Sequence, residues 1–318
     1  MSNAEPDFLT RLLNPPPTQN IRPLPTTGRA GRNLPAAVGV AAALITVLLA
    51  SLLINKALFV VVTVLAVCAA LWELAGAFAV RRIRLPLGPL WLGALGIAEC
   101  AWAVGAEAAF GAYLATVGAC SLWSFLEQAE AETGTMLERP DSGAPRTYAH
   151  DDHRRSRSVA TFAAIFAATY LPFLSGFAVL LCGQYNGVGK VLLLIGLAVA
   201  NDTGGWLAGI TLGRHPMAPS VSPKKSWEGL GGSMVAAIAG GVLGVYLLGG
   251  AWWAGALLGA GIVVVSTLGD LGESLIKRDL GLKDMGTLLP GHGGVLDRLD
   301  SILVAAPVVY LFSILLLP

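Results

Sequence analysis

The charged residues of this chain are concentrated between Ser274 and Asp300, in the sequence SLIKRDLGLKDMGTLLPGHGGVLDRLD. These 27 residues include five basic side chains, counting His292, and four aspartates. Long apolar stretches flank the segment, and charges next to a membrane are costly unless they serve a site. Cations, carboxylates and the Pro-Gly-His-Gly-Gly turn together suit a polyphosphate held with a metal ion. The segment therefore predicts an enzyme that acts on a phosphorylated substrate at the membrane surface.

A predicted helix leads into this segment and carries polar residues along one side. Four of them, at positions i, i+3, i+4 and i+7, share a helical face: Asp270, Glu273, Ser274 and Lys277. Glu273 and Lys277 are also consistent with a surface ion pair, which contributes little. After the glycine-rich turn, Asp297 and Asp300 stand at the entry of the last apolar stretch. Carboxylate oxygens of this kind bind Mg²⁺, with phosphates and waters completing its shell.

A second polar cluster is the loop Gly213–Gly232, GRHPMAPSVSPKKSWEGLGG. Its three prolines keep it out of a helix and stiffen it. Two lysines and two serines come immediately before the next helix: Ser222, Lys224, Lys225 and Ser226. Trp227 and Glu228 lie at the start of that helix, where free backbone N–H groups favour anions. We expect a phosphate-binding loop, although the GxxxxGK[ST] pattern is absent. The alternative is an ordinary basic loop on the inner side of the membrane.

A third polar cluster, Asn201–Trp206, interrupts an otherwise apolar stretch. A carboxylate at Asp202 is unfavourable there unless it is paired or faces a polar cavity. A metal ion or a partner such as Lys224 would offset that cost. The alternative is a buried, hydrogen-bonded aspartate that fixes the packing of the helix.

The composition is that of an integral membrane protein. Hydrophobic residues make up 55% of the 318 and charged residues only 13%, whereas a soluble domain carries roughly 25%. Nine apolar segments approach the ~20 residues that a helix needs to cross a bilayer: 35–54, 57–80, 87–104, 108–126, 159–182, 189–212, 230–249, 252–270 and 299–317. We predict an all-α polytopic membrane protein with about nine transmembrane helices.

The polar stretches divide the predicted fold into four regions. Residues 1–34, rich in Pro and Arg, are predicted to form a disordered cytoplasmic tail. Residues 35–126 form an N-terminal four-helix membrane region, and 127–158 form a cytoplasmic loop that is acidic at first and then basic. Residues 159–318 form a C-terminal five-helix catalytic membrane region, because the three polar clusters all fall within it.

The distribution of Lys and Arg predicts the orientation. With nine spans and a cytoplasmic N-terminus, 19 of the 21 basic residues lie inside, and only Lys56 and Lys190 lie outside. The positive-inside rule favours that arrangement. All three polar clusters then fall on the cytoplasmic side, where nucleotides are found. We expect Asp202 to line a cytoplasm-facing polar cavity that the other two clusters cover.

Other patterns exclude several kinds of site. A net charge of +1 gives no support for nucleic-acid binding. The four cysteines are scattered in apolar stretches without CxxC spacing, and the four histidines show no zinc-ligand pattern. Two carboxylates, Glu73 and Glu99, stand in the apolar N-terminal half. They are interpreted as helix-packing or interfacial residues, and the alternative is a catalytic role.

The segment from Ser274 to Asp300 closely resembles the signature of the phosphatidate cytidylyltransferases, also called CDP-diacylglycerol synthases. The signature is met without a gap by these residues: Ser274, Lys277-Arg278, Lys283-Asp284, Gly286, Leu289-Pro290, His292-Gly293-Gly294, Asp297-Arg298 and Asp300. Two upstream motifs of the family, DTGAY and SPKKTWEG, are matched by Asp202–Trp206 and Ser222–Gly229 with mild changes. The resemblance is specific from about residue 195 to the end.

The resemblance implies a reaction in which CTP and phosphatidate give CDP-diacylglycerol and pyrophosphate. It implies Mg²⁺ at Asp270 and Asp297, with a second cation such as K⁺. Catalytic roles are also expected for Asp202, Lys277, Arg278 and His292, and His292 is equally consistent with a role in stabilising the turn. The expected substrate-binding residues are Ser222, Lys224, Lys225, Trp227, Glu228, Ser274, Lys283, Asp284, Gly293, Gly294, Arg298 and Asp300. A homodimer in the cell inner (plasma) membrane is also implied, with the site facing the cytoplasm.

Two other functions stay open at this point. A CTP-dependent lipid kinase would use the same cations but transfer the γ-phosphoryl group. A secondary transporter is suggested by nine spans with a polar break near Asp202. Transporters often contain two related halves, and the first half of this chain has no counterpart of the polar clusters.

Overall fold

The computed structural model describes residues 12–18, 34–138, 158–286, 288–289 and 293–317. These residues are almost entirely helical. The helices are α2 (Leu34–Ile54), α3 (Lys56–Ala79), α4 (Leu87–Ala103), α5 (Ala106–Glu138), the helix Ser158–Gly183, α8 (Gly187–Leu212), α9 (Trp227–Leu247), α10 (Trp252–Leu280) and α11 (Leu296–Leu316). The helix Ser158–Gly183 contains a π-helical turn, η1 (Thr169–Phe173), at Pro172 and ends as α7 (Leu174–Gly183).

The helices confirm that this is an all-helical membrane protein. Seven helices in the described chain are long and apolar enough to cross a membrane. Two others, Ala42–Ile54 and Leu87–Ala103, are shorter apolar helices. Each of the nine predicted spans coincides with a helix. The number of helices that cross the bilayer, nine, stays a prediction.

Two helices are longer than the hydrophobic pattern indicated. The region 127–158 was expected to be a loop, but α5 continues to Glu138. The sequence EQAEAETGTMLE favours this, since most of its residues are good helix formers and the first proline comes only at position 140. Residues 139–157 lie outside the described part. Helix α10 likewise continues ten residues past the predicted membrane span, which ends at 270, and its extension carries the predicted polar face from Asp270 to Lys277.

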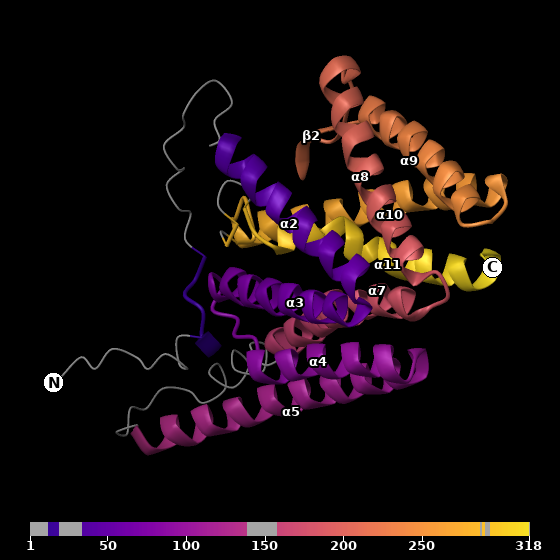
Figure 1. The fold of residues 1–318 in the computed structure, drawn as a ribbon. Helices are drawn as coiled ribbons and strands as arrows, with labels where there is room; N and C mark the ends of the chain where they lie inside the picture. Colours follow the sequence, from indigo (N-terminus) through magenta and orange to yellow (C-terminus); the bar gives the residue numbers. More distant parts are fainter. Residues whose placement is uncertain (1–11, 19–33, 139–157, 287, 290–292, 318) are drawn as a thin grey trace.

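The helices are arranged around a central pair (Figure 1). Helices α10 and α11 pack against each other, with α8 and α9 on one side and α3, α4 and α5 on the other. One apolar core joins α3, α4 and the helix Ser158–Gly183 to α10 and α11, and a second joins α7 and α8 to α11. The polar clusters of the C-terminal half are therefore carried by helices that touch one another.

The loop between α8 and α9 forms a small β-hairpin. Strands β1 (Pro216–Ala218) and β2 (Ser222–Ser226) pair antiparallel, with Pro216 opposite Ser226. Ser226 then caps α9, because its hydroxyl accepts a hydrogen bond of 3.1 Å from the backbone N–H of Gly229. The cap and the hairpin together place the two lysines of β2 directly beside the first turn of α9.

Part of the N-terminal region packs onto the helices, which corrects the expectation that all of 1–34 is a disordered tail. The backbone N–H of Thr18 donates to the carbonyl of Gly76 on α3 over 3.0 Å, and Pro15 is buried. Gly76 permits this contact, since an added Cβ would lie 3.2 Å from the Thr18 hydroxyl. Residues 1–11 and 19–33 lie outside the described part.

The predicted orientation can be tested at the two ends of α8. Ser220 in the hairpin and Tyr185 before α8 are both exposed. We predict that Ser220→Cys, in a background without the four native cysteines, reacts with an impermeant thiol reagent only after right-side-out vesicles are opened. Tyr185→Cys should react in intact vesicles. Labelling of Ser220→Cys from outside would overturn the cytoplasmic placement of the site.

Candidate active site

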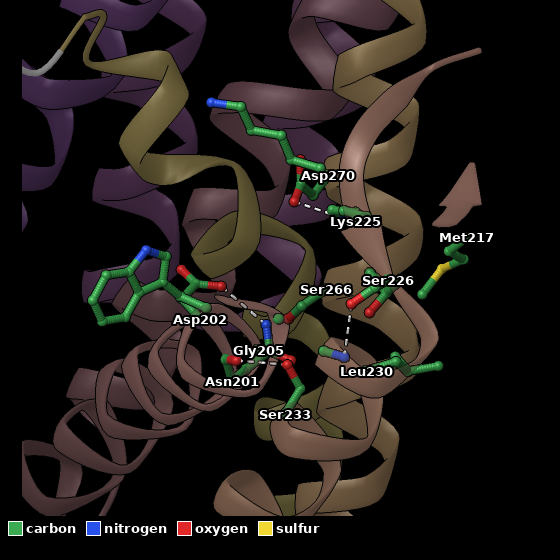
Figure 2. A pocket seen from close by; sticks show the side chains of 15 residues that line it. Asn201, Asp202, Gly205, Met217, Lys225, Ser226, Leu230, Ser233, Ser266 and Asp270 are labelled. Atoms are coloured by element: carbon green, nitrogen blue, oxygen red, sulfur yellow. Dashed lines mark hydrogen bonds and ion pairs between the residues drawn. The ribbon is translucent and has the colours of Figure 1, made fainter. Parts of the chain in front are cut away.

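A pocket of about 290 Å³ opens between β2 and helices α8, α9 and α10 (Figure 2). Its walls contain polar residues of the cluster Asn201–Trp206, of the loop Gly213–Gly232, and of the helix that leads into the segment Ser274–Asp300. No described residue of that segment itself is in the lining. The lining residues are Asn201, Asp202, Gly205, Trp206, Gly209, Met217, Lys224, Lys225, Ser226, Gly229, Leu230, Ser233, Ser266, Thr267 and Asp270. The structure thus brings together segments that are separated by up to about seventy positions in the chain.

The contacts across the pocket are made by residues of opposite charge. The ammonium of Lys225 lies 2.5 Å from a carboxylate oxygen of Asp270, and Figure 2 shows the two side chains pointing toward each other. Both are partly exposed, with relative side-chain exposures of 22% and 41%. Asp202 accepts a hydrogen bond of 3.0 Å from the side-chain amide of Asn201. The pair of Lys225 and Asp270 joins the hairpin to α10 at the mouth of the pocket.

Two further side chains hold the hairpin in place. The Arg278 side chain of α10 donates a 3.2 Å hydrogen bond to the carbonyl of Val221. Glu228 accepts from the backbone N–H groups of Arg214 and His215 and contacts the His215 ring over 2.5 Å. Arg278 and Glu228 therefore position the hairpin and do not line the pocket. The indole of Trp227 is 59% exposed and also lies outside the lining.

The inner wall of the pocket carries oxygen atoms with spare hydrogen-bonding capacity. The side-chain carbonyl of Asn201 and the hydroxyl of Ser266 are buried and have no hydrogen-bond partner among the described residues. Buried polar groups are normally satisfied, so these atoms suit a ligand, a water molecule or a cation. In the described residues, however, no three His, Cys, Asp or Glu side chains form a group that could hold a metal ion.

A second group of charges lies where α10 meets α11. The ammonium of Lys277 contacts Glu273 Oε1 and Asp297 Oδ1, each at 3.0 Å. The relative side-chain exposures are 15% for Lys277, 1% for Glu273 and 7% for Asp297. The pair Glu273–Lys277 considered from the sequence is thus present but buried. Because both carboxylates already neutralise Lys277, this cation is a structural link in the present arrangement.

Asp297 also holds the segment between α10 and α11. Its Oδ2 accepts hydrogen bonds from the backbone N–H groups of Met285 at 3.1 Å and Gly294 at 3.0 Å. Since Oδ1 is in contact with Lys277, both oxygens of this predicted metal ligand are engaged by donors. Asp297 and Asp270 therefore differ in their contacts. Both oxygens of Asp297 accept from nearby donors, whereas Asp270 faces the pocket.

Glu73 is the residue whose importance the sequence did not reveal. It lies on α3, far from the motifs, and its two oxygens accept hydrogen bonds from the backbone N–H groups of Leu288 at 3.2 Å and Leu296 at 3.0 Å. Its interpretation as a helix-packing residue is incomplete, because Leu288 lies in the α10–α11 connection and Leu296 is the first residue of α11. Glu99 is exposed.

The other predicted site residues surround this connection and do not line the pocket. Ser274 is buried in α10, while Lys283, Asp284 and Arg298 are exposed. Asp300 accepts a hydrogen bond from its neighbour Ser301, and Gly293 forms a β-bridge with Leu289. Ser222 begins β2, and His292 lies outside the described residues.

Comparisons with known proteins match these motifs to a family. The model of the cytidylyltransferase family matches residues 35–316. The chain belongs to the cytidylyltransferase family. The resemblance inferred from the sequence is thereby confirmed, and so is its prediction that the protein is an enzyme that transfers a nucleotidyl group.

Similar proteins carry a more specific name. A phosphatidate cytidylyltransferase of Mycobacterium bovis is 37% identical over 304 residues, which cover 93% of this chain and 93% of the relative. That of Mycobacterium leprae is 39% identical over 299 residues, covering 91% and 90%. That of Synechocystis is 47% identical over 139 residues, covering 42% and 46%. Similarity to the two mycobacterial proteins extends over nearly the whole chain.

The different contacts of Asp297 and Asp270 lead to a stability prediction. Asp297→Ala leaves two buried N–H groups without an acceptor and removes one partner of Lys277. We expect this variant to lose about 2–4 kcal/mol of unfolding free energy. Asp270→Asn, at the partly exposed mouth of the pocket, should lose less than about 1 kcal/mol. Thermal unfolding of both variants in the same detergent measures the contrast. Equal midpoints would show that Asp297 has no structural role.

Proposed function

We propose that the protein transfers the cytidylyl group of CTP to phosphatidate, giving CDP-diacylglycerol and pyrophosphate for phospholipid synthesis. The observation that carries this proposal is the match of the family over residues 35–316, together with relatives that bear this name. The pocket supports it, because Lys224 and Lys225, the only described residues that line it with a positive charge, share the space of about 290 Å³ with the carboxylates Asp202 and Asp270.

The chemistry suits these residues. A phosphate oxygen of phosphatidate attacks the α-phosphorus of CTP, a new P–O bond forms, and the bond to the departing pyrophosphate breaks. Two anions must approach each other, so charge neutralisation and positioning supply most of the catalysis. Lys224 is exposed and Lys225 is partly exposed, so both can contact phosphate oxygens. Lys225 exchanges Asp270 for a phosphate when the nucleotide binds.

The donor atoms of the pocket fit Mg²⁺. Mg²⁺ is bound by one or two carboxylates together with substrate phosphates and waters, so a group of three acidic residues is not needed. Asp270 is the primary ligand in this proposal, supported by its partial exposure in the pocket, whose lining also includes the unpaired carbonyl oxygen of Asn201. When bound, the metal neutralises the phosphate oxygens. Asp297 stays the predicted second ligand and would release Lys277 to take that role. A second cation such as K⁺ stays a prediction.

The environment follows from the same proposal. Phosphatidate is a lipid, so its tails remain in the bilayer while its headgroup reaches the site from the side. The polar cavity faces the cytoplasm, because CTP is hydrophilic and the excess of basic residues favours that side. The cell inner (plasma) membrane and a homodimer are expected from the resemblance to the family.

The decisive experiment follows the products. Purified protein with CTP labelled at the α-phosphate, phosphatidate and Mg²⁺ should yield a labelled lipid and unlabelled pyrophosphate. Asp270→Asn serves as the inactive control and should lose most of the turnover, since the amide keeps the shape but loses the charge. A CTP-dependent lipid kinase would instead release CDP and leave the lipid unlabelled. That result would refute the proposal.

The two lysines of β2 should act on the nucleotide. We predict that Lys224→Ala with Lys225→Ala raises the KM for CTP by about tenfold or more, because two contacts with phosphates are lost. The KM for phosphatidate should change less. Arg84→Ala, which removes an exposed cation outside the pocket, is the matched control and should behave like the wild type. Unchanged kinetics in the double variant would mean that the hairpin lysines only orient the protein in the membrane.

A further inference from the structure

Glu73 is a buried carboxylate on a helix that carries none of the family motifs. Only 2% of the residue is exposed, and its environment on α3 is otherwise apolar. One of its oxygens accepts from the N–H of Leu288 at 3.2 Å and the other from the N–H of Leu296 at 3.0 Å. These two acceptor contacts join the N-terminal half of the chain to the connection between α10 and α11.

The connection is shaped to receive this carboxylate. An added Cβ at Gly286 would lie 2.1 Å from the carboxyl carbon of Glu73, and one at Gly294 would lie 2.6 Å from its Oε2. Neither position has room for a side chain. The backbone at Gly286 and at Gly294 is therefore packed directly onto Glu73. Each contact can be disrupted by a substitution at Glu73 or at the glycine.

Glu73 and Asp297 hold the same segment through different N–H groups. Asp297 binds the N–H groups of Met285 and Gly294, and Glu73 binds those of Leu288 and Leu296. The two carboxylates thus alternate along the described parts of the segment 285–296. Because Asp297 also holds Lys277, a shift of this segment would move charges of both α10 and α11.

We propose that Glu73 is a positioning residue of the active site: it fixes the α10–α11 connection by accepting hydrogen bonds from Leu288 and Leu296. This inference rests on the proposed cytidylyl transfer, since the activity measured is that reaction. Glu73 acts through the backbone of the connection and does not touch the substrates.

The substitution Glu73→Gln tests this role with the smallest change of shape. A carboxylate offers acceptor oxygens to both N–H groups, whereas the amide of glutamine must turn its NH₂ group toward one of them. We expect turnover to fall by about tenfold to a hundredfold. Glu73→Asp keeps both acceptors and the charge on a shorter side chain and should recover part of the loss. Glu99→Gln, an exposed carboxylate of the same half, is the matched control with wild-type turnover.

Hydrogen exchange separates positioning from general stability. In Glu73→Gln the peptide covering 285–296 should exchange its amide hydrogens at least about tenfold faster, while peptides from α8 and α9 keep their wild-type rates. Gly286→Ala should accelerate the same peptide. The double variant should be little worse than either single one, because both changes break one contact.

The outcomes are distinct. Wild-type turnover in Glu73→Gln, or faster exchange in every helix, would overturn the positioning role while leaving the proposed function intact. Absence of a labelled CDP-lipid with the wild-type protein would refute the proposed function instead. In that case the exchange pattern alone still tests the contact between Glu73 and the connection.

Discussion

Polar groups inside a bundle of apolar helices must satisfy one another, and this constraint governs the arrangement of the candidate site. The connection between α10 and α11 brings free backbone N–H groups against the helices, where water cannot reach all of them. Two carboxylates from opposite ends of the chain, Glu73 and Asp297, accept those hydrogen bonds. Unsatisfied N–H groups in such a place cost several kcal/mol each. The connection can fold back onto the bundle because these acceptors are present.

The same constraint divides the cations into two kinds. Lys277 is enclosed between Glu273 and Asp297, where removal of either partner would leave a buried charge. Lys224 and Lys225 stand on a hairpin at the open side of the pocket, and water partly screens the contact of Lys225 with Asp270. An exposed pair is more easily exchanged for a phosphate than an enclosed one. The hairpin lysines are therefore the exchangeable charges of the candidate site, whereas Lys277 is held more firmly.

Much of this arrangement could be predicted from the sequence. The apolar segments predicted the position of each helix, because a helix that crosses a bilayer needs ~20 mainly apolar residues in a row. Clustering of Asp202, Lys225 and Asp270 in one pocket was expected from their residue types, which a membrane helix retains only for a reason. The β-hairpin was harder to predict from the sequence. Prolines excluded a helix in that loop, but they did not indicate which strands would pair.

Glu73 shows why the rest of the candidate site could not be predicted from the sequence. Its partners are backbone N–H groups, which every residue except proline possesses, so no residue type at positions 288 or 296 points to it. A single glutamate in an apolar helix looks the same whether it faces lipid headgroups or a distant loop. The only trace in the sequence is glycine at 286 and 294, where the carboxylate leaves no space for a Cβ. The sequence pattern assigns glycines of this segment to a predicted phosphate site, so their contact with α3 becomes visible only when the helices are placed in space.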